Sequence, residues 1–141
     1  MREILFKGAQ KVDCAKSLVW YEGSLIIETD SYTGEKEYYI QNENGSYLVI
    51  PETVGQYTGL PDKNGKKIFE EDIVAHFINW HGKRFNGVVR YESKIACWVC
   101  DFVVNNKTES AYLADWVHGN GAEVIGNIHD NPELLKEAEN E

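Results

Sequence analysis

The sequence predicts a mainly β protein, α+β at most, built from short and closely spaced strands. Runs of β-branched and aromatic residues recur along the chain, and turn segments rich in glycine and asparagine separate them. Only one segment, beginning at Asn131, has the features of a helix start. Hydrophobic residues make up 43% and charged residues 26% of the 141 residues, which is typical of a folded globular protein.

The order of these signals predicts three regions. Residues 1–55 read as a β-hairpin-rich N-terminal region, and residues 56–130 read as a small barrel or sandwich of about five short strands. Residues 131–141 read as a C-terminal helix that ends in an acidic tail. The resulting expectation is one compact β-barrel with smaller elements on either side.

The N-terminal region contains two pairs of strand signals. Residues 18–21 and 25–27 predict two short strands, with Gly23 and Gly34 as punctuation. Residues 38–40 and 47–50 predict a hairpin around Asn44-Gly45, because asparagine and glycine both tolerate a positive φ.

The later strands are predicted from their apolar patterns. Residues 73–78 are apolar on both faces, which predicts a strand buried on both sides, while residues 85–91 and 96–104 alternate. A turn is expected at residues 105–107, and residues 112–117 and 122–128 are expected to be closing strands. At the C-terminus, Asn131 can cap a helix, Pro132 suits its first position, and Glu133 suits its positive end.

The net charge of −9 and the pI of about 4.9 argue against passive binding to nucleic acid. Residues 61–94 are an exception, because seven basic and five acidic residues give this segment a charge of +2. No apolar run approaches the ~20 residues that a membrane span requires. The charged start predicts no signal peptide, so a cytoplasmic protein without membrane contact is expected.

Three cysteines fit a reducing compartment. Cys97 and Cys100 have the spacing of a metal or dithiol motif, but they fall in a predicted strand, where residues three apart point to opposite faces. No second pair of ligands completes a zinc site. We therefore predict no metal and no cofactor.

A turn-rich motif before the strand at residues 73–78 has a structural explanation. Glycines serve turns, short polar side chains bond to their own backbone, and carboxylates accept N–H bonds at the entry to a strand. A second motif lies around residues 123–135. The residues expected to have structural roles are Gln56, Thr58, Gly59, Asp62, Asn64, Gly65, Glu70, Asp72, Gly126 and Asn127.

Two functional interpretations use the same region. Tyr57, Lys63, Lys67 and Trp80 could line a groove between loops, where small barrels bind peptides or nucleic acid. Alternatively, the acidic residues 70–72 could bind magnesium, with His76 as a base. Consecutive strand residues cannot all converge on one ion, so no catalytic residue is assigned.

Both motifs resemble the YopX family of phage and prophage proteins, through residues 51–60, 62–74 and 123–135. The resemblance implies a β-rich protein with an SH3-like barrel in its C-terminal part, encoded by temperate phages, with no recognised active site. One departure is Glu71, which stands where the family usually has glycine, so that a positive φ at this position is in question.

Together these observations predict a non-enzymatic binding or regulatory module that contacts a host or phage protein in the bacterial cytoplasm. The alternatives are a nucleic-acid-associated factor that uses residues 61–94 and, third, a metal-dependent hydrolase. The four tryptophans also suggest a homo-oligomer, because aromatic residues are enriched at interfaces.

Overall fold

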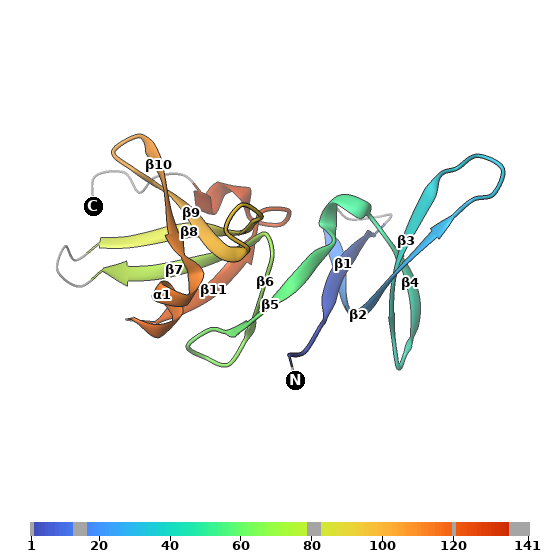
Figure 1. Cartoon of the computed structure of the whole chain (residues 1–141), viewed down its shortest axis with the longest axis horizontal. Coiled ribbons are helices and arrows are strands. Elements are labelled where there is room, and N and C mark those ends of the chain that lie inside the picture. Colours follow the sequence, from blue (N-terminus) through green and yellow to red (C-terminus); the bar gives the residue numbers. More distant parts are fainter. Residues whose placement is uncertain (1, 13–16, 79–82, 120, 136–141) are drawn as a thin grey trace. The chain divides into compact units, whose positions relative to one another are not determined.

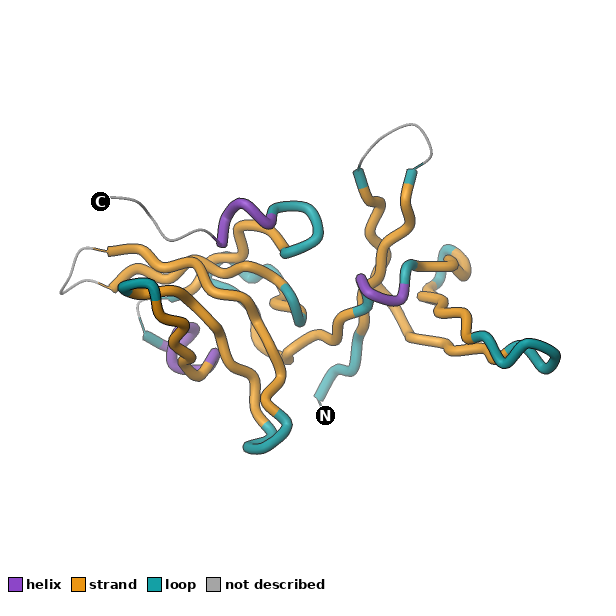
Figure 2. The backbone as a smooth tube through the Cα atoms, turned by 90° about the horizontal axis from the view of Figure 1, so that it is seen from above, coloured by secondary structure: helices purple, strands orange, loops and turns teal. Residues whose placement is uncertain are grey.

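The computed structural model describes residues 2–12, 17–78, 83–119 and 121–135 (Figure 1). Strands dominate, and helical segments are few and short (Figure 2). The chain divides into two compact units, Met1–Tyr57 and Thr58–Glu141. In chain order the elements are β1 (Phe6–Lys11), β2 (Leu18–Thr29), β3 (Lys36–Asn42), β4 (Gly45–Val49), η1 (Pro51–Thr53), β5 (Gly55–Pro61), β6 (Lys67–Phe69), β7 (Asp72–Ile78), β8 (Lys83–Glu92), β9 (Cys97–Val104), β10 (Lys107–Tyr112), α1 (Leu113–His118), β11 (Ala122–Asn127) and η2 (Pro132–Leu135).

The first unit is organised around one long strand, β2. Its first half pairs with β1, and its second half pairs with β3, with the change at Gly23 and Ser24. The prediction of two strands separated at Gly23 is therefore wrong. Gly23 does not form a turn. It allows β2 and β3 to approach each other closely, because a Cβ atom there would lie 2.2 Å from the carbonyl oxygen of Gln41. Strand β1 was not predicted, since its apolar residues are few.

The hairpin of β3 and β4 confirms the prediction made from Asn44-Gly45. Asn42 pairs with Gly45, and the Asn42 side chain accepts a hydrogen bond of 2.8 Å from the backbone N–H of Asn44. Gly45 has a φ of 148°, which favours glycine.

A small core holds the first unit together. Ile40 and Val49 are buried on the inner face of β3 and β4, and both lie against Gly8 of β1. Thr53 in η1 is also buried, where its hydroxyl accepts a bond from the N–H of Ala9 and donates one to the carbonyl of Ile50. The inner face therefore provides the apolar packing of this unit.

The second unit is built on an antiparallel sheet of order β10-β9-β8-β7-β11. Figure 1 shows β7, β8 and β9 side by side. The residues from Ile73 to His76 are all buried, which confirms burial on both sides for this part of β7, whereas Phe77 is 47% exposed. The main core cluster comprises Ile68, Val74, Val89, Cys100, Leu113, Trp116 and Ala122.

The strands of the described residues do not close into a barrel. The five-stranded sheet is open, with β10 and β11 at its edges, and β6 belongs to a six-stranded sheet of order β4-β3-β2-β1-β5-β6. The closing strand expected at residues 112–117 is wrong, because this segment is the helix α1. Leu113 and Trp116 are both buried, and residues three apart share one face of a helix but not of a strand.

Where a C-terminal helix was expected from Asn131, the described residues form the short 3-10 helix η2, which begins at Pro132. Residues 136–141 lie outside the described part, so the rest of the expected helix stays a prediction. The Asn131 side chain accepts a bond from the N–H of Asn127 behind it, at 3.4 Å. None of the helices in the described chain has the length and apolar character needed to cross a membrane.

Candidate functional site

Asp62 organises the turn between β5 and β6. Its Oδ1 accepts hydrogen bonds from the N–H groups of Asn64 and Lys66, at 2.8 and 2.9 Å. Its Oδ2 accepts a bond of 2.9 Å from the N–H of Val124 in β11, 62 residues away. The side chain is only 6% exposed, so one carboxylate shapes the turn and attaches it to a distant strand.

Two opposing effects act on the pKa of Asp62. Burial raises the pKa of this carboxyl, but the N–H donors of Val124, Lys66 and Asn64 favour the charged form. The donors prevail, and the pKa lies below its ordinary value. The motif therefore uses the charge of Asp62 to satisfy backbone donors.

Two further motif residues have internal partners. Thr58 in β5 donates a buried hydrogen bond of 2.8 Å to the carbonyl of Ile68 in β6. Asp72, which is 3% exposed, accepts a bond of 2.8 Å from the N–H of Phe69. Gly59 and Gly65 adopt positive φ values of 87° and 83°, as turn glycines do.

Glu71 keeps the backbone conformation that a glycine would provide. Its φ is 71°, its N–H bonds to the carbonyl of Val89, and its carbonyl accepts the N–H of Ile128. Its carboxylate lies 2.5 Å from Nε2 of His129. Glu71 therefore adopts the positive φ that the sequence left in question. Its side chain adds a contact to the loop after β11.

The second motif forms that loop. The Asn127 side chain accepts bonds from the N–H groups of His129 and Asp130, at 3.0 and 2.9 Å. A Cβ atom on Gly126 would lie 2.4 Å from Oδ1 of Asn131, so a larger residue does not fit. These contacts shape the chain reversal between β11 and η2.

The residues predicted to line a groove differ in their exposure and in their partners. Lys63 is exposed and pairs with Glu123 at 3.6 Å, while Lys67 is partly buried. Tyr57 ends the first unit, where its N–H bonds to the carbonyl of Leu5. Trp80 lies outside the described residues. The groove remains a prediction.

The acidic residues considered for catalysis make separate contacts. Asp72 bonds to the backbone of Phe69, and Glu71 contacts His129. The ring of His76 stacks on Trp116 at 4.9 Å, and its Nδ1 lies 3.1 Å from the carbonyl oxygen of Gly121. In the described parts of the chain, no group of three His, Cys, Asp or Glu side chains is arranged to hold a metal ion.

Strand β9 separates the two described cysteines. Cys100 is buried in the core, and burial raises the pKa of its thiol to about 12, with a further contribution from Asp101. A thiol of this pKa is a poor nucleophile and metal ligand at neutral pH. Cys97 is partly buried, and both cysteines are free.

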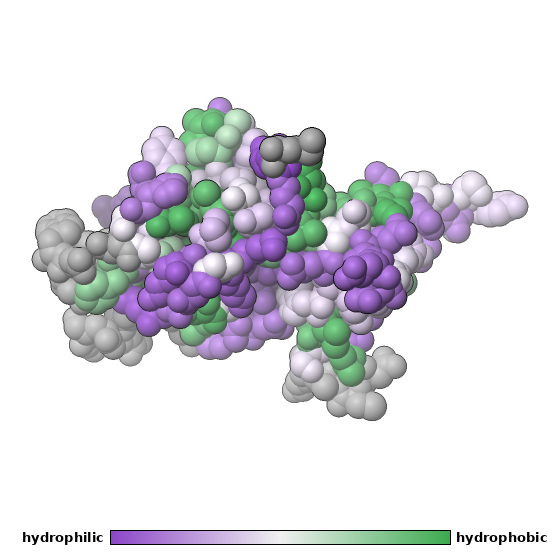
Figure 3. All heavy atoms as spheres, turned by 90° about the horizontal axis from the view of Figure 1, so that it is seen from below, coloured by the Kyte–Doolittle hydropathy of each residue, from purple (hydrophilic) through white to green (hydrophobic). Residues whose placement is uncertain are grey.

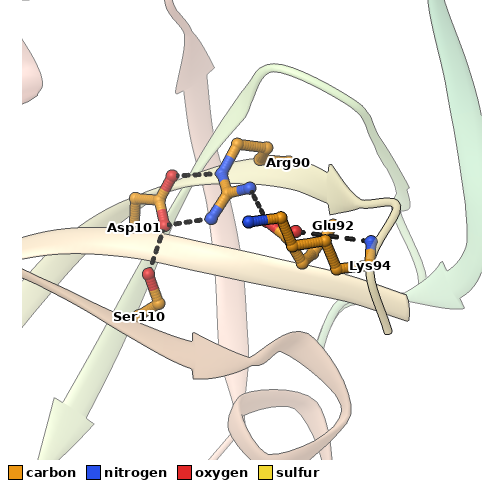
Figure 4. A network of polar contacts seen from close by, with 5 residues as sticks. All are labelled: Arg90, Glu92, Lys94, Asp101 and Ser110. Carbon is orange, nitrogen blue, oxygen red and sulfur yellow. Dashed lines mark hydrogen bonds and ion pairs between the residues drawn. The ribbon is translucent and has the colours of Figure 1, made fainter. Parts of the chain in front are cut away.

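Sequence reasoning missed a polar network on one face of β8, β9 and β10 (Figure 4). Arg90 donates to both oxygens of Asp101, at 2.6 and 3.1 Å, and to Glu92. Ser110 donates to Asp101 at 2.6 Å. The Arg90 bonds lower the pKa of Asp101 against its partial burial. Only the strand register brings these residues together, and no local motif indicates it.

Several large apolar side chains remain exposed on the described surface. On the one face that Figure 3 shows, apolar residues form separate groups with hydrophilic residues between them. The exposed large apolar side chains of the described surface are Ile4, Val12, Val19, Ile27, Tyr32, Leu48, Phe77, Tyr91, Ile95 and Tyr112. The sequence pattern did not single out any of them as a surface residue.

A comparison with protein-family models identifies one family. The model of the YopX protein family matches residues 11–136. The crystal structure of protein yopX from Bacillus subtilis is similar, with a TM-score of 0.54 and 15% identity over 96% of this chain and 100% of that one. Protein EF1440 from Enterococcus faecalis has a TM-score of 0.48 and 20% identity at the same coverage. A search of curated proteins gives no match.

Proposed function

Because the chain belongs to the YopX family, we propose that it is a phage or prophage protein that acts without catalysis, as a binding or regulatory module. It contacts a host or phage protein in the bacterial cytoplasm. The SH3-like arrangement expected for residues 56–130 is part of this proposal, and the five antiparallel strands of the second unit support it.

One observation carries the proposal: the motif side chains are used inside the fold, whereas apolar side chains on strands remain exposed. Asp62, Asp72 and Asn127 each bond to backbone N–H groups. By contrast, Leu48 and Phe77 are 48% and 47% exposed. Exposed apolar and aromatic side chains are what protein partners cover.

The test begins with the tagged full-length chain as bait in extracts of bacterial cells. A protein that is enriched over a bait unfolded by heat is then purified, and its binding is measured by calorimetry. We expect a saturable complex with a negative heat-capacity change, because apolar surface becomes buried. If no enriched protein binds after purification, the proposal fails.

The alternative of nucleic-acid binding has one specific observation in its favour. Phe77 pairs with Arg84 across β7 and β8, so the two side chains share a face of the sheet, and both are exposed. An exposed aromatic ring beside a cation is the arrangement that binds single-stranded nucleic acid. Binding to a labelled oligonucleotide that weakens with salt, and that Arg84→Glu abolishes, would favour this alternative.

A further inference from the structure

The outer face of the first unit carries an apolar row that its core does not use. Ile26 pairs with Tyr39, and Tyr39 pairs with Leu48, so the three side chains lie in a line across β2, β3 and β4. Ile26 and Tyr39 are partly exposed, and Leu48 is 48% exposed. The core residues Ile40 and Val49 alternate with this row and therefore lie on the opposite face.

Two glutamates lie along one side of the row, at the next pair on the same face of β2 and β3. Glu28 and Glu37 are direct partners across β2 and β3, on the same face as Ile26 and Tyr39. Both are exposed, and no ion pair joins either of them to a described lysine or arginine. Like charges placed directly opposite each other destabilise a sheet. The repulsion between Glu28 and Glu37 therefore destabilises the sheet, and a cation bound beside them would reduce it.

The other side of the row is polar but neutral. Ser24 pairs with Gln41, and Gln41 pairs with Ser46, so one side of the apolar row is acidic and the other is not. The pKa of Tyr39 is raised, first by partial desolvation and then by the charges of Glu37 and Glu28, in agreement with this register. The face thus has an apolar centre with its negative charge along one side.

We propose that this outer face docks a cationic, apolar segment of a partner protein, with lysine or arginine beside Glu28 and Glu37 and an apolar side chain on Ile26, Tyr39 and Leu48. This assignment rests on the proposed function and identifies the surface and the partner chemistry. Charge complementarity selects such an occupant. A second copy of the same face fits less well, because the residues named here include no lysine or arginine to place beside Glu28 and Glu37.

The probe is a fluorescein-labelled peptide of alternating lysine and leucine, and its anisotropy is measured with the full-length chain. We expect saturable binding that weakens by about tenfold or more in the double variant Glu28→Gln/Glu37→Gln, because both attractive charges are lost. Leu48→Ser weakens it as well. A peptide of alternating glutamate and leucine does not bind.

The matched control is the double variant Glu109→Gln/Glu133→Gln. Both residues are exposed and lie in the second unit, and the net charge changes by the same amount. We expect binding within about twofold of the wild type, because neither residue lies on the proposed face. Circular dichroism establishes that all the variants are folded.

The outcomes separate this assignment from the proposed function. Absence of saturable probe binding, equal losses in the two double variants, or no loss in Glu28→Gln/Glu37→Gln overturns the assignment. If a purified cellular partner binds the Glu28→Gln/Glu37→Gln variant as tightly as the wild type, the docking face is wrong while the proposed function stands. If no cellular partner binds at all, the proposed function fails.

Discussion

At the scale of single residues, one buried carboxylate shows how a surface-like sequence motif becomes part of the interior. Asp62 lies in a stretch of turn residues, yet it is 6% exposed and bonds to three backbone N–H groups. Water cannot replace these bonds at a buried site, so each donor depends on the carboxylate. The local pattern predicted the turn, but the bond to Val124 required the fold.

Replacing Asp62 with asparagine tests this role. An amide has one acceptor oxygen and no charge, so we expect Asp62→Asn to lower the free energy of unfolding by about 2–3 kcal/mol at pH 7. Urea denaturation measures it. Asp30→Asn is the control, because the bonds from Tyr32 and Thr33 to Asp30 are exposed. A larger loss in Asp30→Asn would contradict the explanation.

The same variant makes the role of Asp62 visible in the pH dependence of stability. The pKa of Asp62 is lower in the folded than in the unfolded chain, where it is about 3.9. Its stabilisation is therefore complete above the unfolded pKa and disappears as pH falls through the folded pKa. We expect the stability difference between wild type and Asp62→Asn to shrink below about pH 4. A constant difference would exclude the charge as its cause.

Glu71 offers a test of backbone conformation. At a φ of 71° an alanine suffers the steric cost that glycine avoids, and neither residue can contact His129. We expect Glu71→Gly to be more stable than Glu71→Ala by about 1 kcal/mol in urea denaturation. Equal stability would mean that this turn relaxes without the positive φ.

At the scale of elements, α1 is a segment whose composition favours a strand but which folds as a helix. Residues 113–118 include valine and tryptophan, which favour strands, but Leu113 and Trp116 both enter the core. In the helix α1 both side chains lie on one face and reach the same core. Tertiary packing thus overrides the local preference at this point.

Shortening Leu113 tests the contribution of α1 to the core. Leu113 is fully buried, so we expect Leu113→Ala to lower the free energy of unfolding by about 2–5 kcal/mol. The adjacent Tyr112 is 54% exposed, and Tyr112→Ala is expected to cost less than about 1 kcal/mol. Thermal and urea unfolding compare the two variants. Similar costs would argue against a packed helix.

At the scale of the whole molecule, each unit has its own buried residues. Ala9, Ile40 and Val49 are buried in the first unit, and the cluster around Val89 and Leu113 is buried in the second. Strand β5 belongs to both, because its Gly55 and Gln56 pair with β1 and its Thr58 bonds to β6. Each unit therefore has its own buried residues, and β5 contributes residues to both units.

Hydrogen exchange read by mass spectrometry tests the separateness of the cores. In Leu113→Ala we expect faster exchange in β8 and β9, while β2 and β3 exchange as in the wild type, because local stability follows local packing. Thr108→Ala, on the exposed edge strand β10, is the control and should leave both regions unchanged. An equal loss of protection in both units would show one cooperative core.

Alternation and turn chemistry in the sequence alone were enough to determine the β-rich class, the hairpin at Asn44-Gly45, and the doubly buried part of β7. They also indicated that residues such as Asp62 and Asn127 shape turns. These features depend on neighbours within a few positions, and local sequence therefore encodes them. The family resemblance was likewise carried by two contiguous stretches.

Only the tertiary structure decided the features that join distant residues. The continuity of β2 past Gly23 depends on the close approach of Gln41, and the helix α1 depends on a core that must accept Leu113 and Trp116. The Arg90 network and the row of Ile26, Tyr39 and Leu48 exist because strand register sets which side chains share a face. Register is a property of paired strands, and no single segment of the chain contains it.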